Sequence, residues 1–493
     1  MSIITAPEHL SLPDGSLLIG RDRIAVSGGG AHSHINPATG QVQATVSLAG
    51  DAEVDAAIRS AREAFDEWKR WPANERRDLL NRIADLLEQH ADEFGAMVTA
   101  ESGVPATMAP MVGASLPVEY FRYYAGWVDK IEGAVIPTFP TASLDYTRME
   151  PIGVVAVIIP WNGPCTSIGQ KVAPALAAGN CVVLKPPELA PFTSLRFAEL
   201  ALEAGLPPGV LNVIPAGPAG GEALVRHPGI DKISFTGGGV TARKILAAAA
   251  PVMTPVLLEL GGKSANIIFD DADLDSAIFT AVTMGVAALS GQACALPTRL
   301  LVQDSVFDDV VEQVTEITKT LEVGDPLSDT TMMGPVISEQ SCDRILGVID
   351  RAVSEKSGTL TTGGRRLGGD LAGGYFLEPT VFADVDNSSH LAQEEIFGPV
   401  LSIIRFGDQQ EAVSIANDSP YGLAGFVFTS DLVRAHTVAA ELDTGYIGVN
   451  HFPVLPPTAP FGGVKQSGHG REGGRDGLQE FLRIKNVNVS LES

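Results

Sequence analysis

The chain has 493 residues, 45% of them hydrophobic and 19% charged, which predicts a globular protein of two or three domains. Its formal net charge of −25 would repel nucleic acid phosphates and anionic membranes, so we expect neither as a partner. The four cysteines show no paired spacing, which argues against a disulfide framework or a zinc site and favours a reducing, cytoplasmic compartment. We expect no signal peptide, no membrane span and no metal.

The first part of the chain predicts helices and then an extended hairpin. An irregular entry segment with short strands ends near residue 50, where apolar residues begin to recur at helical spacing, with Asp51 as the expected cap. A second amphipathic helix runs through 79–87. Between 131 and 149 the sequence alternates in polarity and predicts a hairpin, whose unpaired edges suggest an arm that another chain covers.

The rest of the chain alternates apolar runs with helical stretches, as parallel sheets covered on both faces do. A first series predicts strands at 154–159, 181–184, 210–214 and 232–235, with helices at 165–178, 192–204, 219–226 and 240–250. A second series predicts strands at 266–269, 299–303, 400–406, 424–429 and 446–449, with helices at 273–288, 305–320, 408–417 and 431–441. A terminal strand is expected at 485–491. The predicted fold class is α/β, with two Rossmann-like parallel-sheet domains and a small β arm.

Two cysteines are candidate nucleophiles. Cys294 lies in a loop of small residues, where a substrate could reach its sulfur, and the thiolate is the reactive form. An ordinary buried thiol explains this loop as well or better when the loop is considered alone. Cys165 is a rival, because it follows Pro164 at a predicted helix start, where the helix dipole lowers a thiol pKa.

Two further loops follow predicted parallel strands, at the edge where open α/β sheets bind ligands. In the first, Lys185 and Glu188 flank two prolines; the glutamate could accept hydrogen bonds from a ribose diol and would repel a 2′-phosphate. In the second, Asn162 offers a side-chain amide of the kind that stabilises an oxyanion. Ordinary loop and turn chemistry also accounts for both segments.

A glycine loop and a downstream glutamate allow two interpretations. Gly237, Gly239 and Ala242 fit the G-x-G-x-x-A pattern of a phosphate-binding strand–loop–helix. By that pattern Glu259, 22 residues after Gly237 (259 − 237), would bind ribose hydroxyls. Alternatively, its position after an apolar run can raise its pKa and make it a general base.

Seven segments in this order, taken together, resemble the aldehyde dehydrogenase superfamily. They are Pro160-Trp161-Asn162, Lys185-Pro186-Pro187-Glu188, Phe235-Thr236-Gly237, Glu259-Leu260-Gly261-Gly262-Lys263, Gly291-Gln292-Ala293-Cys294, Glu395-Ile396-Phe397-Gly398-Pro399 and Pro460-Phe461-Gly462-Gly463. The resemblance implies a homodimer or homotetramer. It also implies an NAD-binding domain (1–128 and 148–261), a catalytic domain (262–461) and oligomerisation elements (129–147 and 477–493).

The resemblance also implies roles for individual residues in the oxidation of an aldehyde to its acid. Cys294 resembles the nucleophile, Asn162 with the Cys294 N–H the oxyanion hole, and Glu259 the base that activates water to hydrolyse the thioester. This role replaces the ribose assignment of Glu259. The implied cofactor is NAD rather than NADP, and the residues expected to contact it are Lys185, Glu188, Trp161, Gly237, Gly238, Glu395 and Phe397.

Three positions depart from the usual family pattern. Gly238 stands where serine is usual and Ala242 where glycine is usual, so one hydroxyl contact to the pyrophosphate is lost. Gly163 stands where an aromatic residue is frequent, which predicts a roomy tunnel for a bulky or hydrophobic aldehyde. The expected tunnel residues are Gly163, Ser167, Gln170, Ala293, Ala295 and Phe452.

Three alternatives to this reaction remain. A variant could release the thioester to coenzyme A, but such an enzyme does not need Glu259 as a deacylating base. A thiol hydrolase could use Cys294, Asn162 and Glu259 on esters, which would leave the expected cofactor residues idle. A binding protein could keep the fold without turnover, but the complete catalytic set argues against it.

Overall fold

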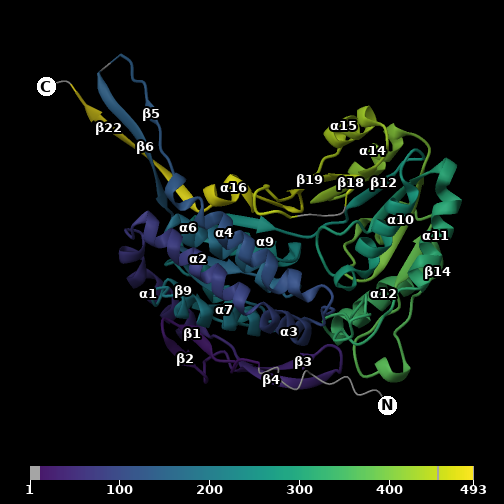
Figure 1. Cartoon of the computed structure of the whole chain (residues 1–493), viewed down its shortest axis with the longest axis horizontal. Helices are drawn as coiled ribbons and strands as arrows, with labels where there is room; N and C mark the ends of the chain where they lie inside the picture. The colour runs from purple at the N-terminus through teal and green to yellow at the C-terminus, as the bar shows by residue number, and fades with distance from the viewer. Residues whose placement is uncertain (1–11, 141, 452–454, 492–493) are drawn as a thin grey trace.

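The computed structural model describes residues 12–140, 142–451 and 455–491, which form two sheet-centred halves and a projecting arm (Figure 1). The chain passes from the first sheet to the second at residues 260–264, between β11 (Val256–Glu259) and β12 (Ala265–Ile268). Both sheets are largely parallel and covered by helices, so the predicted α/β class is confirmed. The domain boundaries expected from the family resemblance stay a prediction.

The first sheet has a parallel centre whose strand order reverses. Its order is β2 (Asp22–Ile24), β1 (Leu17–Ile19), β9 (Leu211–Val213), β8 (Cys181–Lys185), β7 (Val154–Ile158), β10 (Lys232–Thr236), β11 and β21 (Gly468–His469). From β7 the chain builds outward through β8 and β9, and then returns to the other side through β10 and β11. Ligands bind outside the carboxyl ends of strands at such a reversal, which here lies between β7 and β10.

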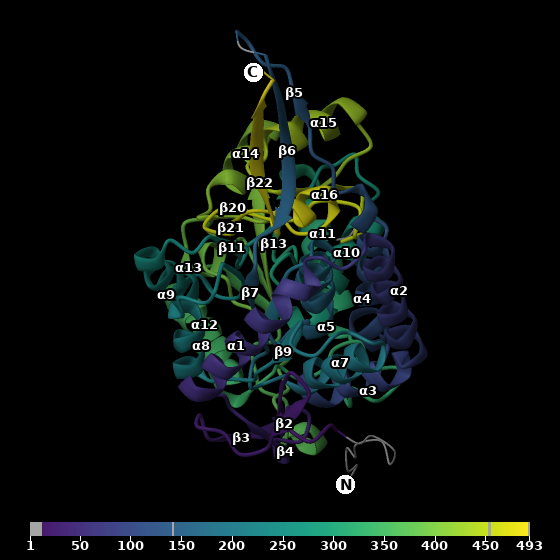
Figure 2. The same cartoon turned by 90° about the vertical axis from the view of Figure 1, so that its left-hand side faces the viewer.

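Helices cover both faces of this sheet (Figure 2). One face carries α1 (Asp51–Trp68), α8 (Pro218–Arg226) and α9 (Gly239–Ala249); the other carries α2 (Ala73–Gln89), α3 (Ala91–Ser102), α4 (Leu116–Ala125), α6 (Ala173–Ala178) and α7 (Phe192–Glu203). The expected start of α1 is confirmed, but the expected cap is wrong. Gly50 is the capping residue, and its N–H donates to the Glu53 carboxylate at 2.8 Å, while Asp51 is the first residue of the helix.

The second sheet is parallel except at one edge. Its order is β14 (Thr359–Thr362), β15 (Thr380–Ala383), β16 (Val400–Phe406), β13 (Arg299–Gln303), β12, β18 (Ala424–Phe428) and β19 (Tyr446–Val449). Neighbouring strand residues such as Ile267 and Ile268 belong to different apolar clusters, so both faces are buried. The covering helices are α10 (Leu274–Val282) and α11 (Phe307–Lys319) on one face, and α12 (Glu339–Glu355), α14 (Gln409–Asn417) and α15 (Leu432–Glu441) on the other.

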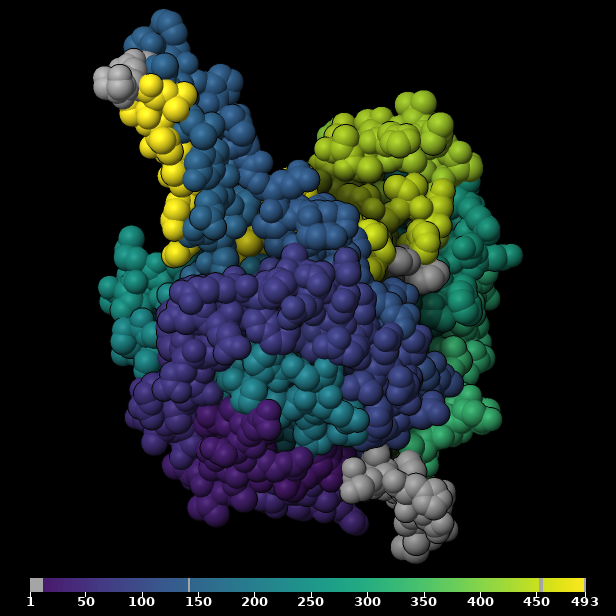
Figure 3. Space-filling model, turned by 60° about the vertical axis from the view of Figure 1, so that its left-hand side comes forward, coloured from purple at the N-terminus to yellow at the C-terminus, as the bar shows by residue number. Residues whose placement is uncertain are grey.

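The arm is a three-stranded sheet that stands clear of the body (Figure 3). β6 (Ser143–Pro151) pairs along its whole length with β22 (Leu482–Ser490), and β5 (Val135–Ile136) pairs with its other edge. The predicted hairpin and terminal strand are both present. Apolar side chains on the arm are exposed: Val135, Ile136, Phe139, Leu144, Ile484 and Val489.

One stretch, Leu274–Gly291, is long and apolar enough to cross a membrane by length and composition alone. The sequence predicted a helix over most of this stretch, at 273–288, and no membrane span. Core helices pass the same test, and 56% of this stretch is buried. It begins with α10, whose side chains pack against the second sheet, and its last turns shape the loop that carries Cys294. We therefore treat it as a core element.

Candidate active site

A cleft of about 1000 Å³ opens where the strand order of the first sheet reverses. Its walls come from the loops after β7, β8 and β10, from α8 and α9, and from the second half of the molecule. It brings together most of the site residues predicted from the sequence: Trp161, Asn162, Lys185, Glu188, Gly237, Gly238, Cys294, Glu395 and Phe397. The cleft is therefore built by both halves.

The loop that carries Cys294 has an unusual backbone held by specific contacts. Leu289 and Ser290 have φ of 49° and 55°, which non-glycine residues rarely adopt. The Ser290 hydroxyl donates to the Gly334 carbonyl at 2.8 Å, and the Gln292 side-chain oxygen accepts the Ile337 N–H at 3.0 Å. Gly291 is also left-handed (φ 71°), and a Cβ there would lie 2.1 Å from the Gly398 carbonyl oxygen. This loop can therefore present Cys294 only with glycine at 291.

Asn162 ties the end of β7 to the cysteine loop. Its side-chain amide donates to the Gln292 carbonyl at 2.9 Å, two residues before Cys294. An amide carries two N–H groups, so this bond orients the side chain and leaves a second donor for a ligand in the cleft. The structure thus places Asn162 and Cys294 together.

The two candidate thiols have different surroundings. Burial raises the pKa of Cys294, and the nearby charges of Glu259 and Glu395 raise it further, but the residue is partly exposed and lines the cleft. Cys165 is 2% exposed, and burial followed by the charge of Glu101 raises its pKa. The helix that begins at Pro164 continues without a break to Ala178, so its dipole would favour the thiolate, but burial outweighs this effect and the pKa is raised. Cys294 is therefore the thiol that a substrate can reach.

Glu259 lies at the end of β11 and is 2% exposed, so it does not line the main cleft. Burial raises the pKa of its carboxyl well above the usual value, and the charge of Glu472 raises it further, while Lys171 opposes the rise. Lys171 and Glu472 form an ion pair buried behind it. One Glu259 carboxyl oxygen is buried without a hydrogen-bond partner among the described residues. Such an oxygen is available to a water or a proton donor.

Glu395 and Phe397 form the cleft wall of the second half. The Glu395 carboxylate accepts the Gly262 N–H at 3.0 Å, and burial raises the pKa of this glutamate to about 7. The Phe397 ring meets the Trp161 ring edge-on, with centroids 5.4 Å apart. On the opposite wall, Lys185 Nζ lies 3.7 Å from Glu188 Oε2, and burial lowers the pKa of Lys185.

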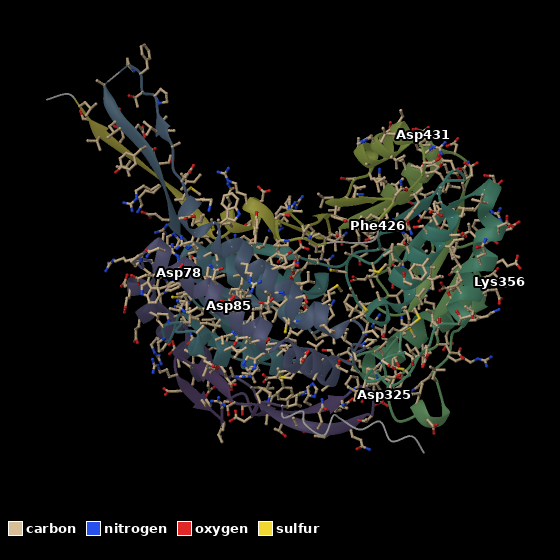
Figure 4. All side chains as sticks on the ribbon, in the orientation of Figure 1. Asp78, Asp85, Asp325, Lys356, Phe426 and Asp431 are labelled. Carbon is tan, nitrogen blue, oxygen red and sulfur yellow. The ribbon has the colours of Figure 1, made fainter. Side chains whose placement is uncertain are left out.

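The residues expected to line a substrate tunnel have mixed positions. Gly163, Ser167, Gln170, Ala293 and Ala295 do not line the main cleft, and Phe452 lies outside the described residues. Gln170 is buried and donates to the Tyr120 hydroxyl at 3.4 Å. Ala295 belongs to an apolar cluster with Leu423, Ala424, Phe426 and Phe461, against which Cys294, Tyr446 and Leu455 pack. Phe426, labelled in Figure 4, lies inside the second half.

The cleft also contains residues that the sequence analysis missed. They come from α8, α9 and α12: Gly217, Gly221, Glu222, Arg226, Thr241, Lys244, Ser341 and Arg344. The small residues at the start of α8 directly follow a parallel strand, which was a usable signal. No sequence signal marked Arg344, because α12 reaches the cleft only through the tertiary fold. The cleft lining holds four cations and three carboxylates, and Lys185 and Arg226 pair with Glu188 and Glu222. Lys244 and Arg344 form no ion pair within the described part of the chain, and they suit an anionic ligand.

Comparisons with known proteins agree with one another. The sequence model of the aldehyde dehydrogenase family matches residues 26–487. Retinal dehydrogenase 2 of Homo sapiens is 42% identical over 92% of this chain and 88% of its own. The mitochondrial succinate-semialdehyde dehydrogenase of Arabidopsis thaliana is 43% identical over 92% and 85%. The structure of betaine aldehyde dehydrogenase from Staphylococcus aureus with NAD⁺ superposes with a TM-score of 0.95 at 37% identity, over 99% and 96% of the two chains.

The electrostatics of the site predict the order in which the thiols react. Iodoacetamide should alkylate Cys294 before the buried Cys165, Cys181 and Cys342. In Glu259→Gln the pH of half-maximal alkylation should fall, because the substitution removes a negative charge that raises the Cys294 pKa. Mass spectrometry of quenched samples measures both effects. Cys294→Ser should remove the fast phase, and the exposed Glu67→Gln should leave the profile unchanged. A profile unaffected by Glu259→Gln would contradict this prediction.

Proposed function

The chain belongs to the aldehyde dehydrogenase family and is an oxidoreductase, and on that premise we propose that it oxidises a bulky or hydrophobic aldehyde to the carboxylic acid with NAD. The observation that carries this proposal is the Asn162–Gln292 bond, which joins the expected oxyanion donor to the nucleophile loop. Asn162 and Cys294 line the same cleft as Lys185, Glu188 and Glu395.

The cleft fits a dinucleotide. Gly237 and Gly238 lead into the N-terminus of α9, where unpaired backbone N–H groups attract phosphate, and nothing crowds the side of Gly238. Glu188 and Glu395 can accept hydrogen bonds from the two riboses, and Trp161 and Phe397 can contact the nicotinamide end. Glu188 would repel a 2′-phosphate, which favours NAD over NADP. NAD, when bound, supplies the acceptor for the hydride that leaves the aldehyde carbon.

The residues of the chain account for the remaining chemistry. The Cys294 thiol releases its proton to solvent water, and the resulting thiolate adds to the aldehyde carbonyl to form a thiohemiacetal, whose oxyanion receives hydrogen bonds from Asn162 and the Cys294 N–H. Once oxidised, the adduct is a thioester. Glu259 removes a proton from water, the hydroxide attacks the thioester carbonyl, and the acid leaves as the sulfur regains its electron pair.

The raised pKa of Glu259 gives the reaction a pH dependence of definite sign. A base must be ionised to accept a proton, and burial with Glu472 shifts that ionisation upward. Hydrolysis of the thioester therefore accelerates as the pH rises through the pKa of Glu259. The charge of Lys171 opposes the rise in this pKa, so the acceleration occurs at a lower pH than burial and Glu472 alone would give.

The aldehyde is argued from the site, because relatives named for retinal, succinate semialdehyde and betaine aldehyde resemble the chain to similar degrees. Cys294 packs against the apolar cluster of Phe426 and Phe461, with Tyr446 at its edge. Gly163 has room for a side chain, since a Cβ there would meet only the Thr166 side chain, at 3.8 Å. These two features support a bulky or hydrophobic substrate.

Assembly and location complete the proposal. The exposed apolar side chains of the arm support a homodimer or homotetramer in which a second copy covers the arm. All four cysteines are free, which supports a reducing, cytoplasmic compartment.

A spectrophotometric assay tests the reaction and the alternatives. Wild type should form NADH with an aldehyde panel, and Cys294→Ala should lose about a thousandfold or more in kcat. Glu259→Gln should release one burst of NADH per active site and then turn over about a hundredfold more slowly, because the thioester accumulates. Esterase activity without NADH from any aldehyde would favour the thiol hydrolase, and NADH formation that needs coenzyme A would favour the acylating variant.

Cofactor choice is tested at Glu188. Glu188→Gln should raise kcat/KM for NADP about tenfold, because the repulsion between the Glu188 carboxylate and the 2′-phosphate, roughly 1.4 kcal/mol, is removed. The same substitution should raise KM for NAD a few-fold. Glu222→Gln is the matched control, since Glu222 also lines the cleft and has Arg226 beside it at 2.8 Å, as Glu188 has Lys185. Steady-state kinetics with both cofactors measures the ratio, and an unchanged ratio in Glu188→Gln would reject this role.

Substrate size is tested at Gly163. Gly163→Phe should lower kcat/KM for naphthaldehyde about tenfold or more and leave acetaldehyde within about twofold, because only the large group competes for the space. Gly163→Ala fits without displacement and should leave both unchanged. Equal losses on both aldehydes would contradict the proposal of a roomy substrate site.

A further inference from the structure

The hairpin of β3 (Ala31–Asn36) and β4 (Gln41–Ser47), which lies along α3, contains a buried histidine with no assigned role (Figure 1). His34 is 1% exposed, and its Nε2 atom lies 2.9 Å from the Leu189 carbonyl oxygen. Leu189 directly follows Glu188 in the loop after β8. The histidine therefore contacts the loop that carries the expected ribose contact.

A chain of hydrogen bonds determines which ring nitrogen carries the proton. The Asn36 side-chain oxygen accepts the Ala38 N–H at 2.9 Å, so the Asn36 amide N–H donates to the Gln43 side-chain oxygen, at 3.0 Å. Gln43 Nε2 therefore faces the Ala100 carbonyl oxygen, at 2.7 Å, and His34 Nδ1, at 3.1 Å. Because Nδ1 accepts a hydrogen bond, the proton of the neutral ring is on Nε2, the nitrogen that faces the loop.

A β-bulge brings Gln43 to the histidine. In the pairing of β3 with β4, His34 lies opposite Ala44 and Ile35 lies opposite Val42, so Gln43 is an extra residue in β4. In a regular ladder Gln43 would lie on the other face from His34, because successive side chains of a strand alternate between faces. A bulge redirects the side chain of the extra residue and is frequent next to active sites. Here it lets Gln43 reach the ring.

The histidine ring is neutral near pH 7. Burial lowers the pKa of His34 to about 4, and the charge of His32 lowers it further, while the backbones of Leu189 and Glu101 oppose the fall. A neutral ring has a single N–H, and Gln43 assigns it to Nε2. The hydrogen bond to Leu189 thus depends on Gln43 as well as on His34.

This hydrogen bond acts on a tight turn. The Ala190 N–H donates to the Pro187 carbonyl at 3.3 Å, so Glu188 and Leu189 are the central residues of the turn. The Leu189 carbonyl and the Ala190 N–H belong to the same peptide group. His34 therefore holds one side of that group and Pro187 the other, and the turn that carries Glu188 at the cleft is fixed from both sides.

We propose that His34 is a positioning residue for Glu188: its Nε2–H fixes the turn that presents the Glu188 carboxylate to the adenosine ribose of NAD. The inference rests on the proposed function, because it assigns a ribose contact to Glu188. His34 does not line the cleft, so it acts on the cofactor through the turn. A carboxylate that must be ordered on binding lowers the affinity for the cofactor without changing the chemistry at Cys294.

The test is equilibrium binding, measured by fluorescence, of NADH and of an NADH analogue whose adenosine ribose lacks the 2′-hydroxyl. His34→Phe keeps an aromatic ring against Phe192, whose ring centroid lies 5.1 Å from that of His34, but removes the N–H. It should raise the Kd of NADH about fivefold and that of the analogue less than about twofold, because the analogue offers Glu188 one hydroxyl fewer. The kcat at saturating NAD should stay within about twofold of wild type.

Two substitutions connect the effect to the N–H and to Glu188. Glu188→Ala should raise the Kd of NADH about tenfold, and adding His34→Phe should change that value by less than about twofold. His34→Gln places an amide N–H near the position of Nε2 and should bind NADH within about twofold of wild type. A loss in His34→Gln as large as that in His34→Phe would overturn the role of the N–H.

The hairpin also offers a control and a second test. His32→Phe makes the same exchange at a half-buried position on the same strand and should match wild type. Gln43→Leu leaves the histidine ring but removes the donor that assigns its proton to Nε2. It should raise the Kd of NADH about threefold and that of the analogue less, and it serves as the test if His34→Phe does not fold.

The possible failures can be distinguished. Binding of NADH by His34→Phe as tight as by wild type would overturn this inference alone. Equal losses for NADH and the analogue, or a loss that adds to that of Glu188→Ala, would also overturn it, because they indicate a general structural effect. Wild-type protein that binds no NADH would overturn the NAD proposal and this inference together.

Discussion

The active site depends on the close approach of two glycines in the buried crossing between the sheets. A Cβ on Gly261 would lie 2.1 Å from the Glu395 carboxylate, and one on Gly262 would lie 2.5 Å from the Cys294 carbonyl oxygen. Either side chain would push the second half away from β11, where Glu259 ends the strand. The absence of side chains at these positions is therefore what lets Glu259, Cys294 and Glu395, the proposed base, nucleophile and ribose-binding carboxylate, share one site.

The crossing is held by polar contacts from both halves, which explains why it can be buried. The Ser467 hydroxyl donates to the Gly261 carbonyl at 2.7 Å, and the Arg299 guanidinium donates to the Lys263 carbonyl at 3.0 Å. Each bond satisfies a backbone oxygen that would otherwise be left without water. Hydrogen bonds from both halves thus hold the segment in place, although it does not pair with a neighbouring strand.

The pattern of the sequence was sufficient for most of the fold. The strands predicted at 299–303 and 400–406 match β13 and β16 residue for residue, because strands buried on both faces are mostly apolar, although Ser402 and Arg405 interrupt the run in β16. No element was predicted for α3, α4, α12, β14 or β15. α4 carries buried tyrosines and a phenylalanine around much of its surface, so its apolar residues do not recur at a clear helical spacing. β14 is an edge strand composed mostly of threonines.

The site was predictable wherever a residue follows a strand, and not where charges meet across the fold. Asn162, Lys185 and Glu188 could be found because strand ends of one sheet lie together. Lys171, Glu472 and Arg344 are far apart in sequence, and no local pattern marks them. Burial is the main cause that raises the pKa values of Glu259 and Glu395; Glu472 adds to the rise at Glu259, while Lys171 opposes it at Glu259 and Arg344 opposes it at Glu395. The motifs therefore predict which groups react, while the protonation state of those groups depends on burial and on charged partners that only the folded chain assembles.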